Sequence, residues 1–267
     1  MDVRVRNNVH ILGVDGAPTV MLAHGFGCDQ EMWRRVTAPL SERFRIVLFD
    51  HVGSGGADPS AWDPDRYASL DAYASDILDI VDGLELRDAV FVGHSVAAMM
   101  GVLAAGARPG AFAKLVLVTP SPCYIDDGDY QGGFTRADID DLLDSLESNY
   151  LGWSRAIAST IVGNPGRPEL SEELAETFCR TDPACAKVFA RTTFLSDNRA
   201  DLSKVSAPTL ILECAEDVIA PAGVGSYVAA RIAGSKLVTL DTTGHCPQLS
   251  APEATAAEIA SFVDGTP

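Results

Sequence analysis

Short apolar runs alternate with helical patterns along most of this chain, and that alternation limits the possible folds more than any other feature of the sequence. Six runs rich in β-branched or apolar residues have the length of buried strands: 19–23, 44–49, 89–92, 114–119, 209–214 and 236–240. Residues 70–84 place apolar side chains at helical spacing and aspartates on the opposite face. The alternation predicts an α/β fold, a mostly parallel, doubly wound sheet whose site lies at the carboxyl ends of the strands.

The first residues depart from this pattern. Residues 3–12, VRVRNNVHIL, alternate around the pair Asn7-Asn8. This arrangement predicts a short β-hairpin with a turn that tolerates positive φ.

A second departure lies in the middle of the chain, where residues 123–197 contain no convincing strand and several prolines. Amphipathic stretches predict four helices there, the third opened by Ser171: 137–146, 150–162, 171–179 and 183–194. We interpret residues 123–197 as a four-helix lid, inserted into a core that residues 1–122 and 198–267 form.

The strongest local motif is AVFVGHSVAAMMG, in which an apolar run enters Gly93-His94-Ser95-Val96-Ala97 and then a helix of small residues. A strand, tight turn and helix of this kind hold a serine in a strained conformation with its hydroxyl above the sheet. Glycine at 93 meets the need for a small neighbour, whereas Ala97 adds a methyl group where glycine is usual. Because a serine at such a junction can also be a plain helix N-cap, the pentapeptide alone leaves both interpretations open.

A serine nucleophile needs a base, which in this type of fold follows the serine in the chain. Of the five histidines, only His245 comes after Ser95, and it directly follows the last predicted strand. A carboxylate should orient that histidine, and Asp217 in the turn after the run 209–214 is our choice. Asp241 is the rival, but it ends the histidine's own strand, where capping a local turn is the simpler role.

An oxyanion formed at the serine needs two donors. The backbone N–H of Val96, at the start of the helix, is the first, and the N–H of Phe26 in the turn His24-Gly25-Phe26-Gly27 is the second. Asp50 and His51, after another predicted strand, are expected to hold loops beneath the site.

Composition excludes several classes of function. With 37 acidic against 20 basic residues, the formal charge of −17 disfavours nucleic acid and anionic membranes. No apolar run is long enough to span a membrane, and the first residues lack the apolar stretch of a signal peptide, so we expect a cytoplasmic protein. The six cysteines are too scattered for a disulfide framework, and we expect neither a metal nor a cofactor.

The motifs HGFGCDQEMW, LFDHVGSGGAD, FVGHSV, TPSPCY, YLGWS, LSDNRADLSKV and GHCPQLSAPE span nearly the whole chain. Together they resemble those of the α/β-hydrolase family, and within it the RsbQ-type bacterial hydrolases related to the plant strigolactone and karrikin receptors. The resemblance implies a lid of four helices over a largely apolar pocket and a Ser95-His245-Asp217 triad. It also implies a protein partner, a PAS-domain phosphatase. We expect the following residues to face the pocket: Phe134, Trp153, Ile157, Phe194 and Val218.

Two functions remain open at this point. The chain is expected to be a serine hydrolase that cleaves a small, largely apolar ester or lactone through an acyl-enzyme. The alternative is a ligand-sensing signalling regulator, in which binding or slow hydrolysis drives a protein interaction. A complete triad is expected for both.

Overall fold

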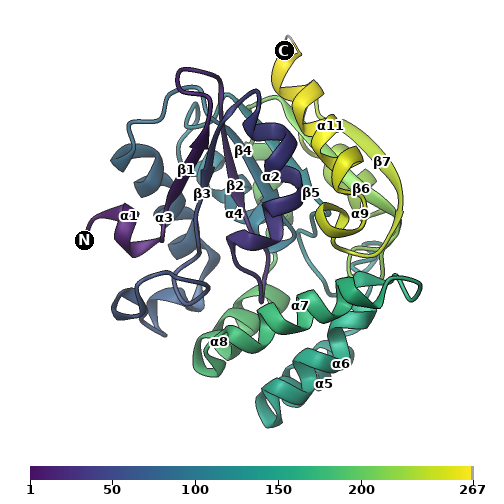
Figure 1. Ribbon diagram of the computed structural model, residues 1–267. Coiled ribbons are helices and arrows are strands. Elements are labelled where there is room, and N and C mark those ends of the chain that lie inside the picture. Colours follow the sequence, from purple (N-terminus) through teal and green to yellow (C-terminus); the bar gives the residue numbers. More distant parts are fainter. Residues whose placement is uncertain (266–267) are drawn as a thin grey trace.

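The computed structural model describes residues 1–265 and contains one seven-stranded sheet with helices on both faces (Figure 1). The strands lie in the order β1-β3-β2-β4-β5-β6-β7; β1 is antiparallel to β3 and every other pair is parallel. Their bounds are β1 His10–Gly13, β2 Thr19–Ala23, β3 Arg45–Leu48, β4 Val90–His94, β5 Lys114–Val118, β6 Thr209–Glu216 and β7 Lys236–Thr243. The predicted mostly parallel, doubly wound sheet is confirmed.

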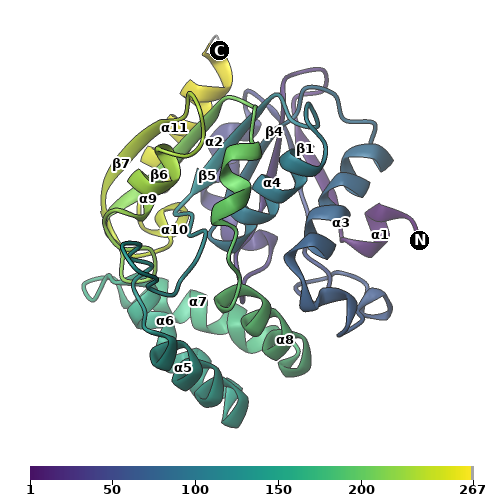
Figure 2. The ribbon, with the colours of Figure 1, turned by 180° about the vertical axis from the view of Figure 1, so that it is seen from behind.

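Helices cover the sheet in two layers. α2 and α11 pack on one face, and α3, α4 and α9 pack on the other (Figures 1 and 2). The bounds of the helices outside the central segment are α1 Val3–Arg6, α2 Arg34–Ser41, α3 Leu70–Gly83, α4 Val96–Ala107, α9 Val224–Ala229, α10 Pro247–Ser250 and α11 Pro252–Asp264. None of the helices in residues 1–265 has both the length and the apolar character needed to cross a membrane.

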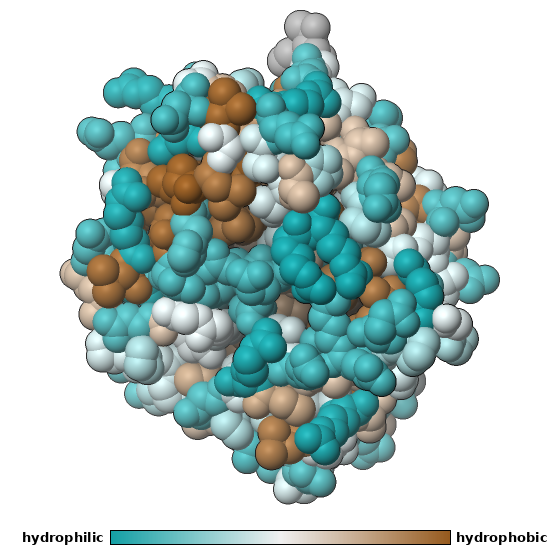
Figure 3. All heavy atoms as spheres, in the orientation of Figure 1, coloured by the Kyte–Doolittle hydropathy of each residue, from teal (hydrophilic) through white to brown (hydrophobic). Residues whose placement is uncertain are grey.

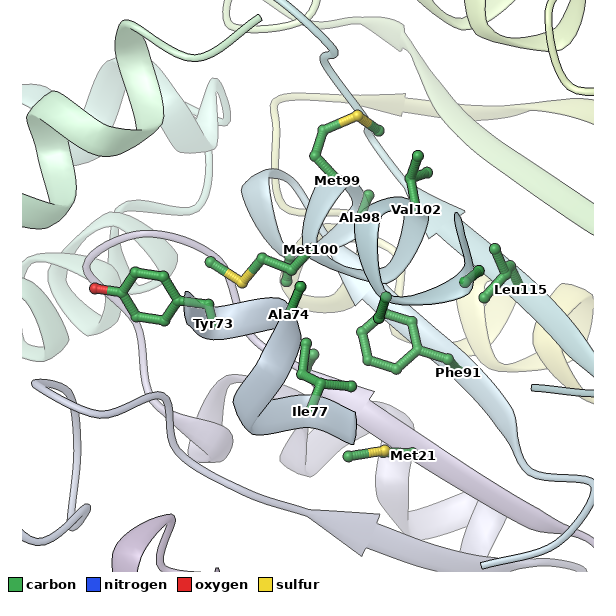
Figure 4. Packing of buried hydrophobic residues seen from close by; sticks show 14 of the residues in the cluster. Met21, Tyr73, Ala74, Ile77, Phe91, Ala98, Met99, Met100, Val102 and Leu115 are labelled. Atoms are coloured by element: carbon green, nitrogen blue, oxygen red, sulfur yellow. The ribbon is translucent and has the colours of Figure 1, made fainter. Parts of the chain in front are cut away.

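The contact between α3, α4 and the sheet shows why α4 consists of small residues. Ala74 and Ile77 of α3 lie beside Met100 of α4, with Phe91 of β4 beneath (Figure 4). A Cβ added at Gly101 would lie 2.4 Å from the ring of Phe91, so only glycine lets α4 approach the strand this closely. This packing fixes the start of α4, which carries the site.

The predicted N-terminal hairpin is wrong. Residues 3–6 form α1, capped by the side chain of Asp2, and β1 pairs with β3 rather than with the preceding segment. Asn8 does adopt positive φ, +45°, as expected of the turn. The pairing partner of β1 is distant in the sequence, so local alternation could not reveal it.

Hydrophilic side chains cover most of the face in Figure 3, and hydrophobic residues gather at its upper left, over the β1 edge.

The central segment forms four helices, which we call the lid helices: α5 Arg136–Ser148, α6 Tyr150–Val162, α7 Pro168–Arg180 and α8 Pro183–Phe194. They lie together beside one end of the sheet (Figures 1 and 2). α7 begins at Pro168 rather than at Ser171, because proline fits the first helical position and its missing N–H is not needed there. The two ends of residues 123–197 meet in a bridge between Cys123 and Asp197.

Candidate active site

Ser95 occupies the turn between β4 and α4 with φ +57° and ψ −124°, a strained conformation for a residue with a side chain. A Cβ at Gly93 would lie 2.5 Å from the carbonyl oxygen of Ala97, so glycine is required at 93. Ala97 itself is fully buried inside α4. The extra methyl group at 97 therefore leaves the turn in place.

The structure brings Ser95, His245 and Asp217 together. Nε2 of His245 lies 2.8 Å from the Ser95 hydroxyl oxygen, and Nδ1 lies 2.7 Å from Asp217 Oδ2. All three residues are buried, each at the carboxyl end of a strand: β4, β6 and β7. The rival, Asp241, lies within β7 with an exposed side chain. The geometry fits a neutral imidazole whose Nδ1–H donates to Asp217 and whose Nε2 accepts from the serine.

Hydrogen bonds keep the Asp217 carboxylate in place. Its Oδ1 accepts from the N–H groups of Ile219, at 2.8 Å, and Ala220, at 3.1 Å. Burial, the largest influence, pushes the pKa of Asp217 up, but the electrostatic interaction and hydrogen bond with His245, together with the two backbone hydrogen bonds, outweigh it and hold the pKa below its ordinary value. Asp217 is thus an anion near neutrality.

Three further histidines, His24, His51 and His94, are buried near the triad and are uncharged. Nδ1 of His24 donates to Gly25 O, and its Nε2 accepts from the His51 N–H. Nε2 of His51 donates to His24 O, and Nε2 of His94 donates to His245 O. Burial is the main cause that lowers the pKa of each ring, to about 3 for His94.

Asp50 joins separate loops under the site. Its carboxylate accepts hydrogen bonds from Asn8 Nδ2, from both nitrogens of Gln30 and from Gly56 N, at 2.8 to 3.0 Å. These contacts confirm that Asp50 and His51 hold loops beneath the site.

The expected oxyanion donors flank the serine. The Val96 N–H starts α4, and Phe26 lies in the turn after β2 between Gly25 and Gly27. No acceptor within residues 1–265 takes a hydrogen bond from either N–H. Both N–H groups are thus without a protein partner in the described part of the chain.

A small, partly open cavity of about 40 Å³ adjoins the serine. Of the residues expected to face the pocket, Phe194 lines it, whereas Phe134, Trp153 and Ile157 pack within the apolar cluster of the lid helices. Val218 is 56% exposed and does not line the cavity; its neighbour Ile219 does. Other residues that line the cavity were not expected from the sequence: Cys28, His94, Tyr124, Ile161, Leu174, Phe178, Thr193 and Cys246.

No group of three or more His, Cys, Asp or Glu side chains within residues 1–265 is placed to hold a metal ion. The six cysteines are free thiols. Burial raises the pKa of Cys28 and Cys246, both beside the cavity, far above the usual thiol value. These thiols are therefore protonated and are weak nucleophiles.

Comparison with known proteins places the chain in a family. Residues 20–258 match the alpha/beta hydrolase family, and the chain belongs to it. It is similar to the strigolactone esterase D14 of Arabidopsis thaliana, with 39% identity over 96% of this chain and 94% of that protein. The karrikin insensitive 2 receptor CA of Petunia hybrida is 38% identical over 94% of this chain and 93% of its own. A hydrolase from Oleispira antarctica has a similar solved structure, with a TM-score of 0.95, 38% identity and coverage of 99% and 97%. The relation to plant strigolactone and karrikin receptors is thereby confirmed.

Proposed function

We propose that this chain is a serine hydrolase that cleaves a small, largely apolar ester or lactone through an acyl-enzyme. One observation carries the proposal: the continuous hydrogen-bond chain from Ser95 through His245 to Asp217, with distances of 2.8 and 2.7 Å. A carboxylate, an imidazole and a strained serine in this order form the arrangement that activates a hydroxyl near neutral pH.

The reaction would proceed in two stages. Ser95 attacks the substrate carbonyl while His245 takes its proton, and the Asp217 carboxylate stabilises the resulting imidazolium. The N–H groups of Phe26 and Val96 stabilise the negative oxygen, and His245 returns the proton to the leaving alcohol. His245 then takes a proton from water as the water attacks the acyl-enzyme, and returns it to the Ser95 oxygen when the bond to the acyl group breaks, which releases the acid and restores Ser95.

The cavity supports the substrate class. Most of its walls are apolar or aromatic, so a charged group would be desolvated there without a partner. The strongly acidic chain adds a further bias against anionic substrates.

The test is turnover of p-nitrophenyl acetate and of a synthetic lactone by the wild type and by Ser95→Ala. We expect Ser95→Ala to lose at least about 10⁴-fold in kcat/KM on both substrates. Ser154→Ala is the matched control, because Ser154 is also buried but its hydroxyl donates to Tyr150 O and Ser154 does not line the cavity. Phenylmethylsulfonyl fluoride should add one sulfonyl group to the wild type, at Ser95, by mass spectrometry. Hydrolysis by Ser95→Ala at the wild-type rate would refute the proposal.

The small size of the cavity favours a second candidate function, ligand sensing. Ligand pockets commonly measure about 300–1,000 Å³, whereas the cavity measures about 40 Å³, so a ligand of ordinary size would have to displace part of its wall, to which the lid helices contribute. Such movement can present a new surface to a protein partner, for which the sequence resemblance implies a PAS-domain phosphatase. A wild type that turns over less than about once a minute, beside a Ser95→Ala protein whose lid amides change hydrogen exchange on ligand binding, would favour sensing over a metabolic role.

A further inference from the structure

Two residues outside the triad that line the catalytic cavity carry hydroxyl groups. They are Tyr124, which follows β5, and Thr193 in α8, and both residues are 1% exposed. The remaining lid-side wall is apolar, and consists of Ile161, Leu174, Phe178 and Phe194.

The Thr193 hydroxyl has no hydrogen-bond partner within residues 1–265. Two other helical threonines bond to the carbonyl one turn earlier, Thr177 to Glu173 O at 3.0 Å and Thr255 to Ala251 O at 2.9 Å. The buried hydroxyl of Thr37 in α2 also has no partner within residues 1–265, but Thr37 does not line the cavity. A buried hydroxyl without a partner destabilises the fold by about 1–3 kcal/mol. Such a group on the wall of a reaction cavity indicates a ligand that completes its hydrogen bonding.

The Tyr124 hydroxyl has only a weak hydrogen-bond contact in the described part of the chain. Its hydrogen-bond contact within residues 1–265 is Ser95 Oγ, at the long distance of 3.5 Å. Burial raises the pKa of Tyr124 to about 12, so the phenol keeps its proton and can donate it. The ring packs edge-on against Phe194, 5.2 Å between centroids, which fixes the hydroxyl beside the nucleophile.

We propose that Tyr124 and Thr193 form a polar subsite that selects substrates with a second oxygen, an ether, hydroxyl or ring oxygen, besides the ester or lactone group that is cleaved. Tyr124 donates a hydrogen bond to this oxygen, and Thr193 donates to it or accepts from it. The inference rests on the proposed hydrolase function and narrows its substrate class.

Two pairs of esters test the subsite, because the members of each pair differ in one oxygen that replaces a methylene group. The acyl-side pair is p-nitrophenyl methoxyacetate and p-nitrophenyl butyrate, and the alcohol-side pair is 2-methoxyethyl acetate and butyl acetate. The measured quantity is kcat/KM for the ether-containing ester divided by kcat/KM for its partner. Comparing this ratio between variants cancels the intrinsic reactivity of the esters.

Thr193→Val and Tyr124→Phe remove one hydroxyl each and keep the shape of the side chain. We expect each variant to lower the ratio about three- to tenfold in the same pair, as expected for one lost hydrogen bond. Thr192→Val is the matched control, because the neighbouring Thr192 hydroxyl bonds to Tyr67 O, away from the cavity wall. It should leave both ratios unchanged.

The possible results distinguish a failure of the subsite proposal from a failure of the hydrolase proposal. Hydrolysis of all four esters with ratios unchanged in Thr193→Val and Tyr124→Phe would overturn the subsite and leave the hydrolase proposal intact. A ratio that falls equally in Thr192→Val would also overturn it. No hydrolysis of any ester above the Ser95→Ala background would overturn the hydrolase proposal, and the subsite with it. Unchanged thermal unfolding of the two variants excludes misfolding as the cause of an effect.

Discussion

The sheet core and the lid helices contribute different things to the site. The core supplies Ser95, His245 and Asp217 from the ends of strands whose backbone hydrogen bonds fix their positions. The lid helices supply five of the thirteen residues that line the cavity, including Phe178 and Thr193. The positions of the triad residues therefore depend on backbone geometry. The shape of the cavity wall depends on side chains, which can be substituted without moving the strands.

The two regions meet at Phe26. Its ring lies 5.5 to 6.2 Å from the rings of Trp153, Phe178, Phe189 and Phe194, all from the lid helices. The neighbouring turn is equally tight, because a Cβ at Gly27 would lie 1.5 Å from the Phe178 ring. Any displacement of the lid helices therefore acts on the turn that carries the proposed oxyanion donor, the N–H of Phe26.

The prediction with the largest expected effect tests whether Asp217, a residue of the sheet core, is needed for ester turnover. Asp217→Asn replaces the carboxylate by an amide, which favours the wrong tautomer of His245, so we expect kcat to fall about 10⁴-fold. Asp241→Asn is the control, because it changes an exposed aspartate on the histidine's own strand. Equal losses in ester turnover for the two variants would contradict the assignment of Asp217.

Much of the core was predictable from the sequence because each parallel strand is a short apolar run with clear ends. The run 19–23 matches β2 to the residue, and in the lid helices 150–162 and 183–194 match α6 and α8. The pairing of β1 with β3 was not predictable, since it depends on residues far apart in the sequence.

The residues brought together around Ser95 were also predictable, because chain order and strand ends restrict where partners of a serine can lie. The cavity wall was not. Ile157 was expected to face the pocket, but Ile161, one turn later on α6, lines it. The position of α6 against His245, whose N–H donates to Ile161 O at 2.8 Å, decides between them, and that tertiary contact leaves no local pattern.

The second prediction compares stability. Phe91→Ala empties the core beside α4, so we expect the free energy of unfolding to fall by about 3–5 kcal/mol in urea titrations. Leu143→Ala leaves a cavity in the separate apolar cluster of the lid helices, and it should lower the free energy of unfolding of that cluster by about 2–5 kcal/mol. Hydrogen exchange should then show lost protection in α5–α8 and unchanged protection in β2, β4 and β5. Equal loss in the strands would mean that core and lid unfold as one unit.

The third prediction uses pH, because His24, His51 and His94 belong to the core and residues 123–197 contain no histidine. Burial lowers the pKa of these rings below the unfolded value of 6.5. The unfolded chain therefore binds more protons below pH 6.5, and core stability should fall as the pH drops, by up to about 1.4 kcal/mol per pH unit for each ring. For His94 the loss continues down to its pKa of about 3.

Urea unfolding between pH 7.5 and 5 at fixed ionic strength measures this slope. His94→Gln should have a smaller slope than the wild type by about 1.4 kcal/mol per pH unit near pH 5. His10→Gln, which changes an exposed ring, is the control. A slope in His94→Gln equal to that of the wild type would show that this ring does not contribute.

The smallest expected effect concerns the ion pairs that attach α7 to the core. Glu173 of α7 pairs with Arg34 and with Arg35, the latter at 2.8 Å, and all three side chains are partly exposed. Since solvent screens such pairs, Glu173→Gln should change global stability by no more than about 1 kcal/mol, and amide exchange in α7 should rise only a few-fold. The increase should vanish at 1 M salt, where the Debye length is about 3 Å. Glu172→Gln, at a position without an ion pair in residues 1–265, is the control, and an increase that persists at high salt would assign the effect to packing rather than to charge.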